Sequence, residues 1–180
     1  MVLEQRKDFY SRFLDAVGPY VGMVTVSDDM GSQEGPLMSY NLYREMIKPY
    51  HKELYTFMKD IADVKIFLHC CGAISGFLDD FVDEGVDVIN PVQVSAKGMD
   101  ATNLKQKFGD KIVFWGGGCD TQRVLQFGTV DEVEEEVKRR ISEFKQGGGF
   151  VFAPTTPIQP GTPSENILAL YDAANEYRYY

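Results

Sequence analysis

Short apolar runs alternate with longer amphipathic segments along the chain. The runs are rich in valine, isoleucine and phenylalanine, and most of them show little polar alternation. Such runs are typical of strands that are covered on both faces, as in a parallel sheet. They predict strands at residues 20–27, 65–68, 86–90, 112–115 and 150–153.

The segments between these runs have helical periodicity. In residues 3–17, the side chains of Phe9, Phe13 and Leu14 fall on one side of a helix. The same kind of pattern predicts further helices at 39–61, at 73–84 with Gly85 as its C-cap, and at 100–108, 130–145 and 163–177.

Two helix boundaries have specific local signals. Pro49 lies inside the 39–61 segment, and a proline there predicts a kink or two helices that meet near Lys48. Thr162 followed by Glu165 predicts a capping box at the start of the last helix.

The repeated strand–helix order predicts an α/β fold with parallel strands and helices outside them. The polar and thiol side chains that could do chemistry come directly after strands, as they do at the working face of a (β/α)8 TIM barrel or of an open α/β sheet. A complete barrel has eight strands and about 250 residues. With about five strands, residues 1–180 are expected to be a single domain that forms the C-terminal part of an incomplete TIM-barrel-like fold.

The composition of the chain argues against some kinds of partner and location. The chain has 27 acidic and 18 basic residues and a net charge of −9, which argues against nucleic acid as a partner. No apolar stretch approaches the roughly 20 residues of a membrane span. Three cysteines, two of them adjacent, make a poor disulfide framework, so we expect a cytoplasmic protein.

The candidate chemistry is concentrated in one tripeptide, His69-Cys70-Cys71, at the end of the second predicted strand. Side chains two apart on a strand lie on the same side, so His69 and Cys71 are expected to face one way and Cys70 the helix layer. Imidazole and thiolate are favoured zinc ligands, and a catalytic zinc needs three protein ligands and an open position. Cys119, after the fourth strand, is the candidate for the third ligand, although the sequence does not fix which way its side chain points and the thiol could instead fill space beside Gly118.

Other polar residues follow the same strands. Asp28 and Asp120 are candidate catalytic carboxylates, although an aspartate there often serves a turn or a helix N-cap instead. Asn90 and Gln93 are candidate substrate-binding residues in the loop after the third strand, although Asn90, which precedes a proline, is a turn candidate first and a pocket residue second.

Several motifs, taken in order, resemble the uroporphyrinogen decarboxylase family, which includes tetrapyrrole decarboxylases and corrinoid-dependent methyltransferases on a (β/α)8 barrel. The resemblance extends over nearly the whole chain. The motifs that carry it are Ser27-Asp28-Asp29-Met30-Gly31-Ser32-Gln33, His69-Cys70-Cys71-Gly72, Gly85-Val86-Asp87-Val88-Ile89-Asn90-Pro91-Val92-Gln93, Phe114-Trp115-Gly116-Gly117-Gly118-Cys119-Asp120-Thr121-Gln122 and Pro160-Gly161-Thr162-Pro163-Ser164-Glu165-Asn166-Ile167.

Within this family the His-x-Cys pair resembles the methyltransferase branch. The resemblance implies a zinc held by His69, Cys71 and a third ligand near the last strand, where this chain has Thr156, a poor zinc ligand that we assign to substrate binding. It also implies a corrinoid supplied by a partner protein. The expected reaction is methyl transfer from a methyl-corrinoid to a small acceptor, either a thiol or a reduced pterin.

Two alternatives remain open at this stage. A tetrapyrrole decarboxylase, a carboxy-lyase, would use Asp28 against pyrrole N–H groups, but Lys97 and Arg123 are the only nearby cations expected to bind the acid side chains. The other alternative is an inactive partial barrel that is stable only as a homo-oligomer or beside a missing N-terminal half, because an incomplete barrel exposes unpaired strand edges.

Overall fold

The computed structural model describes residues 2–179 and contains one five-stranded parallel sheet. The strands lie side by side in sequence order: β1 (Met23–Ser27), β2 (Lys65–His69), β3 (Val88–Asn90), β4 (Val113–Trp115) and β5 (Phe150–Val151). Parallel neighbours that follow one another without a reversal of order are the pattern of a barrel rather than of a doubly wound sheet.

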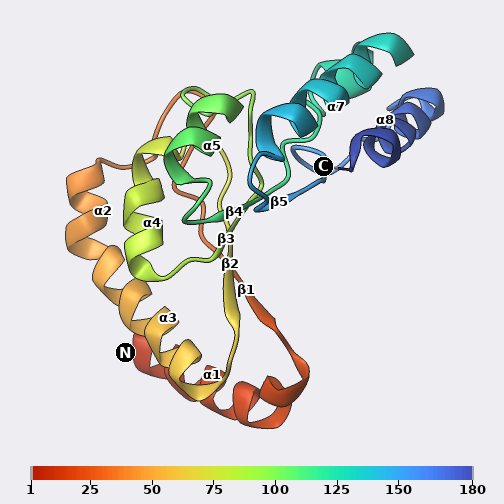
Figure 1. The fold of residues 1–180 in the computed structure, drawn as a ribbon. Helices are drawn as coiled ribbons and strands as arrows, with labels where there is room; N and C mark the ends of the chain where they lie inside the picture. The colour runs from red at the N-terminus through yellow and green to blue at the C-terminus, as the bar shows by residue number, and fades with distance from the viewer. Residues whose placement is uncertain (1, 180) are drawn as a thin grey trace.

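Helices connect the strands and cover the sheet on one side (Figure 1). In Figure 1, α2, α3 and α4 lie to the left of the first strands, and α7 and α8 lie beyond β5. The helices are α1 (Val2–Val17), α2 (Tyr40–Met46), α3 (Lys48–Ile61), α4 (Leu78–Glu84), α5 (Ala101–Phe108), α6 (Val124–Phe127), α7 (Val130–Phe144) and α8 (Ser164–Tyr177), with 3-10 turns η1 (Gly18–Tyr20) and η2 (Ser75–Phe77). The fold is therefore α/β and matches the predicted incomplete TIM-barrel-like architecture.

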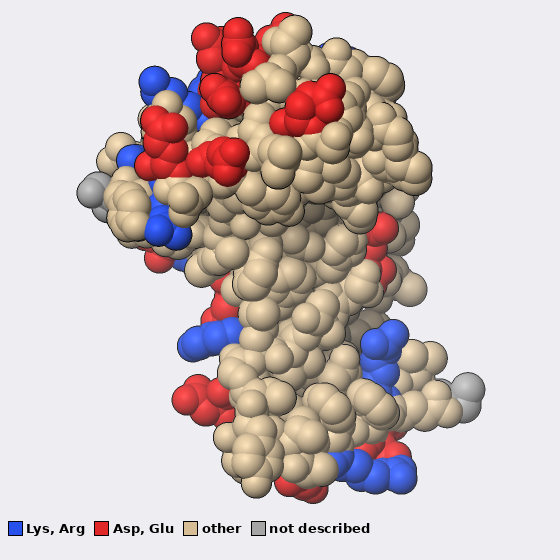
Figure 2. Space-filling view, turned by 90° about the vertical axis from the view of Figure 1, so that its right-hand side faces the viewer, with Lys and Arg blue, Asp and Glu red and all other residues tan. Residues whose placement is uncertain are grey.

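The two faces of the sheet differ in burial. Ile66 and Leu68 on β2 point to the helices and are fully covered, while Met23 and Thr25 on the opposite face of β1 are exposed. Figure 2 views the molecule from the side away from α2–α4, and the middle of that side carries few charged side chains. Within residues 2–179 no strand pairs with the outer edge of β1. This inner face corresponds to the interior of a barrel of which the chain forms one sector.

The break in the 39–61 segment is confirmed. Helix α2 ends at Met46 and α3 begins at Lys48, with Pro49 in its first turn, where the missing N–H costs no hydrogen bond. Gly85 also caps α4 as expected, with a left-handed φ of 93°. The segment predicted as helix from Ala73 instead begins with the 3-10 turn η2, and only Leu78–Glu84 is α-helical.

The capping box predicted at Thr162 is wrong. Helix α8 begins at Ser164 after Pro163, and the Thr162 hydroxyl donates to the Gln159 carbonyl instead of capping the helix. The capping box of the described chain lies at α7, where Thr129 and Glu132 hydrogen-bond each other's backbone N–H groups. The short helix α6 was also not predicted.

Candidate metal centre

The imidazole of His69 and the thiol of Cys71 lie together at the C-terminal end of β2. Nε2 of His69 is 3.4 Å from Sγ of Cys71, and both side chains are half-buried. Cys70 points the other way, is fully buried, and its sulfur accepts a hydrogen bond from the Met30 N–H at 3.3 Å. The predicted alternation along this strand end is therefore confirmed.

Asn90, at the end of the neighbouring strand β3, orients the imidazole. Its side-chain NH2 group donates to the Trp115 carbonyl at 3.1 Å, so its oxygen faces Nδ1 of His69 at 2.8 Å. An amide oxygen only accepts, so Nδ1 carries the proton and Nε2 presents its lone pair toward Cys71. A second ring nitrogen held in this way is the usual arrangement of a metal-binding histidine.

The third group of the centre is Asp29, from the loop after β1. Potential ligand atoms of Asp29, His69 and Cys71 all lie within 4.8 Å of one another. Oδ1 of Asp29 accepts the Cys71 N–H at 2.8 Å, which ties the two loops together directly beside the thiol. No other group of at least three such residues occurs in the described part of the chain.

Two glycines allow these loops to meet. A Cβ added at Gly72 would lie 2.5 Å from the Gly31 carbonyl carbon, and one at Gly31 would lie 2.7 Å from the Cys71 oxygen. Gly72 also has a φ of 87°, a conformation that other residues rarely adopt. The close backbone contact places the carboxylate of the first loop against the thiol of the second.

Electrostatics keep the free thiol neutral. Burial and the nearby charge of Asp29, which also hydrogen-bonds it, raise the pKa of Cys71 to about 11. A divalent cation beside the sulfur would offset both effects, because it stabilises the thiolate and binds the carboxylate.

The donor set fits zinc. Imidazole nitrogen, thiolate sulfur and carboxylate oxygen are all zinc ligands, and three protein ligands with an open side are the pattern of a catalytic site. Here Asp29 is exposed, and His69 and Cys71 are half-buried.

The two candidate catalytic carboxylates lie away from this cluster. Asp28 turns to His51 on α3, with 3.2 Å between Oδ2 and Nε2, whereas the next residue, Asp29, faces the centre. Asp120 is buried, and its Oδ1 accepts the Gln122 N–H at 2.8 Å, as in an Asx turn. A catalytic role for either remains a prediction, and nothing in their contacts with the described residues adds to it.

Cys119 lies outside the cluster, so the prediction that it is the third ligand is replaced. Its side chain is fully buried and lies 3.4 Å from a Glu136 carboxylate oxygen on α7, in a core cluster with Leu125 and Val133. Burial first, and then the charge of Glu136, raise its pKa. The alternation after β4 points this thiol into the helix layer, so Asp29 replaces it as the candidate ligand.

The candidate substrate-binding residues support the loops around the centre. The Gln93 side-chain oxygen accepts the Gly72 N–H at 2.9 Å, and the hydroxyls of Thr156 and Thr121 are 2.5 Å apart. These contacts link the loops after β2 and β3 and those after β4 and β5. Contact of Asn90, Gln93 or Thr156 with a substrate remains a prediction.

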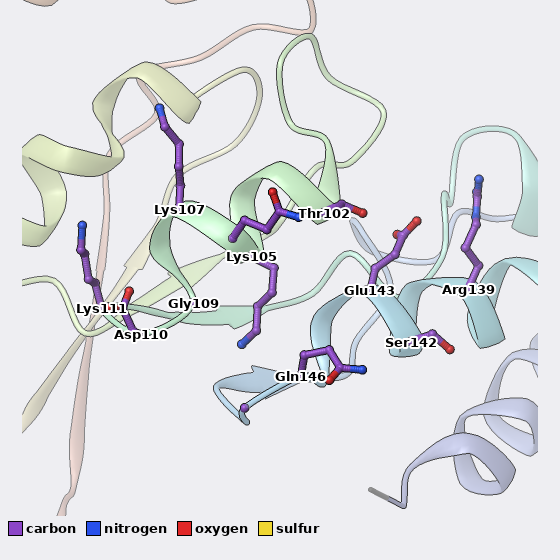
Figure 3. A pocket seen from close by; sticks show the side chains of 12 residues that line it. Thr102, Lys105, Lys107, Gly109, Asp110, Lys111, Arg139, Ser142, Glu143 and Gln146 are labelled. Atoms are coloured by element: carbon purple, nitrogen blue, oxygen red, sulfur yellow. The ribbon is translucent and has the colours of Figure 1, made fainter.

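A groove of the described structure lies away from this cluster. It measures about 770 Å3 and lies between α5 and α7. Gly109 and Gly147, which line it, precede β4 and β5, so the groove lies at the N-terminal ends of these strands, opposite the cluster. Figure 3 shows that the amines of Lys105, Lys107 and Lys111 point in different directions. Lys105 donates to the Gly148 carbonyl, so these amines do not converge on one anion.

Residues 2–177 match the family model described as uroporphyrinogen decarboxylase (URO-D). The chain belongs to this family. It is 30% identical over 155 residues to methylcobamide:CoM methyltransferase MtaA of Methanosarcina barkeri, a match that covers 86% of this chain and 42% of that protein. Methylcobamide:CoM methyltransferase MtbA of Methanosarcina acetivorans is 26% identical over 156 residues, with 87% and 42% covered.

Among solved structures, a methyltransferase from Methanosarcina mazei superposes with a TM-score of 0.71 at 23% identity. The superposition covers 98% of this chain and 48% of that one. The chain therefore spans less than half the length of the relatives it matches, in agreement with a partial barrel. None of the helices in residues 2–179 is long and apolar enough to cross a membrane.

Proposed function

We propose that this chain carries the acceptor-activating centre of a corrinoid-dependent methyltransferase. The observation that carries the proposal is the cluster of Asp29, His69 and Cys71 on the open face at the C-terminal end of the sheet. The names of the relatives support it, because they specify a methylcobamide and CoM as the reactants of a methyltransferase. The reaction is transfer of a methyl group from a methyl-corrinoid to a small thiol.

Zinc is the cofactor that this donor set fits, held by Nε2 of His69, Sγ of Cys71 and a carboxylate oxygen of Asp29. When bound, it supplies a Lewis acid that lowers the pKa of an acceptor thiol, so that the acceptor reacts as a thiolate. Sγ of Cys71 would hold zinc as a thiolate, so binding would release the proton that the raised pKa of Cys71 otherwise retains.

The chain's own residues prepare the centre. Asn90 holds the proton of His69 on Nδ1, which keeps Nε2 available as a ligand. Asp29 holds the Cys71 backbone through one oxygen and leaves the other for a cation. Phe67 and Trp115 pack edge to face on the same side of the sheet as His69, with ring centres 5.3 Å apart.

The proposal includes partners. The methyl-corrinoid is carried by a separate protein that docks on the loops after the strands. The inner face of β1 is exposed, and its outer edge pairs with no strand in residues 2–179, so we expect further barrel strands from additional polypeptide or from an oligomer. A cytoplasmic location stays a prediction, consistent with three cysteines that are free of disulfides.

The first test is metal binding. Titration with Zn²⁺, and with Co²⁺ as a coloured probe, is expected to show one site per chain and a sulfur-to-cobalt charge-transfer band. The variants H69A, C71S and D29N are each expected to weaken binding at least about tenfold, while D120N, which changes a carboxylate outside the cluster, leaves it unchanged. Wild-type affinity in all three variants would refute the centre.

The second test is methyl transfer. The zinc-loaded protein is incubated with methylcobalamin and a small thiol, and the loss of the methyl–cobalt absorbance is followed. We expect turnover that depends on zinc and on Cys71. Turnover with a reduced pterin in the absence of zinc would instead identify a pterin acceptor, and release of CO2 from uroporphyrinogen would identify the decarboxylase.

A further inference from the structure

We propose that His51 is a positioning residue for the metal centre: it touches none of the three ligands but fixes the side of the β1 loop on which the Asp29 carboxylate lies. The proposal rests on the metal centre described above and extends it to a residue on α3. It begins with a polar cluster behind the centre, defined by Asp28, Tyr43, His51 and Glu84.

His51 joins two carboxylates in this cluster. Its Nε2 is 3.2 Å from Oδ2 of Asp28, and its Nδ1 is 3.4 Å from Oε2 of Glu84. The Glu84 side chain is completely buried, and its other oxygen accepts the Tyr43 hydroxyl at 2.6 Å. Oε2 has no hydrogen-bond partner among the described residues, so the imidazole is the group that offsets its charge.

These contacts make His51 a cation. Burial by itself lowers its pKa, but its close contacts with Asp28 and Glu84 and the charges of these two carboxylates raise it, on balance, to about 9. The other titratable groups that face this cluster, Tyr43 on α2 and Tyr55 on α3, remain neutral because burial raises their pKa values. At neutral pH a positive imidazolium therefore holds Asp28 to the outer layer of helices.

Because the backbone is extended here, the contact of Asp28 with His51 also sets the direction of the next side chain, Asp29. The Asp28 N–H donates to the His69 carbonyl at 3.0 Å, so strand pairing between β1 and β2 continues through Asp28. Successive side chains on paired extended backbone point to opposite sides. With Asp28 held toward α3, Asp29 must face the β2 loop, where its Oδ1 accepts the Cys71 N–H.

The test measures this hydrogen bond directly in the metal-free protein. In 15N-labelled protein, H51Q is expected to move the Cys71 amide resonance upfield and to speed its hydrogen exchange at least about tenfold. The control K52Q changes the next residue on α3, whose amine pairs with Asp83 at the surface, and should leave Cys71 unchanged. Y43F removes the hydroxyl that donates to Glu84 and also lies 3.3 Å from Nδ1 of His51, but it keeps the contact of His51 Nε2 with Asp28. It should therefore lower Tm without moving the Cys71 amide.

A second readout is Co²⁺ affinity, for which H51Q is expected to raise the Kd by about 10–100-fold, as for other groups that orient ligands. If H51Q does not fold, D28N breaks the same contact from the other side and is expected to give the same two effects. A folded H51Q or D28N with the wild-type Cys71 amide would overturn the proposal. The amide readout needs no metal, so failure of wild-type protein to bind Co²⁺ would reject the metal centre alone.

Discussion

The side-chain oxygen of Asn90 accepts a hydrogen bond from Nδ1 of His69 at 2.8 Å. Because the NH2 group of the same amide is committed to the Trp115 carbonyl, the oxygen cannot exchange places with it without losing both bonds. The tautomer of His69 is thereby set from the neighbouring strand, and the lone pair of Nε2 is directed toward Cys71 before any cation arrives.

This relationship predicts the effect of Asn90 on metal affinity. N90A removes the acceptor for Nδ1–H, and zinc affinity is expected to fall about 10–100-fold because the imidazole loses its orientation. The measurement is a competition titration with a chromophoric chelator. N103A, a change at an exposed asparagine on α5, is the control, and equal affinities of the two variants would argue against the orienting role.

His51 predicts a pH dependence of stability. Its pKa is raised in the folded protein to about 9, above the ordinary value of 6.5. The stabilisation is therefore fully present below pH 6.5 and is lost as the pH rises through 9. The difference in unfolding free energy between wild type and H51Q, from urea titrations, is expected to shrink by about 1–3 kcal/mol between pH 6 and pH 10. A difference that is constant with pH would show that folding does not raise the pKa of His51.

Gly72 predicts a loss of loop contact on substitution. G72A adds a Cβ 2.5 Å from the Gly31 backbone at a φ of 87°, so the loops after β1 and β2 must separate. G147A has a similar φ of 72° but meets nothing within 4 Å, and it serves as the matched control for the backbone strain alone. G72A is expected to be less stable than G147A by at least about 1 kcal/mol and to weaken metal binding. Urea unfolding and Co²⁺ titration of both variants check this.

The capping box of α7 predicts different costs for two threonines. T129A removes the side chain that accepts the Glu132 N–H, and it is expected to cost about 1 kcal/mol. T162A, at the threonine that does not cap α8, is expected to cost less than half as much. Thermal unfolding of both variants compares the two losses of Tm. A larger loss in T162A than in T129A would contradict the observed start of α8.

Much of the fold was predictable because its signals are local. Continuous apolar runs specify the strands, and Pro49 and Gly85 mark helix ends through their own backbone preferences. The Thr162 capping box failed for a similar reason. The motif spacing was present, but Pro163 occupies the N-cap position and leaves no side-chain oxygen there.

For the metal centre, the sequence by itself determined that His69 and Cys71 share a side at the end of a strand, because alternation is a property of the extended backbone. Only the tertiary structure brought Asp29 close to this pair. The contact of Asp29 with Cys71 joins loops that are 42 residues apart in the sequence. It depends on the close approach of Gly31 and Gly72, and Asp28 beside it contacts His51 on α3. No local sequence pattern predicts contacts between residues so far apart. The direction of Cys119 was equally undecided until α7 placed Glu136 against its sulfur, because the phase of a loop after a strand is set by what packs on it.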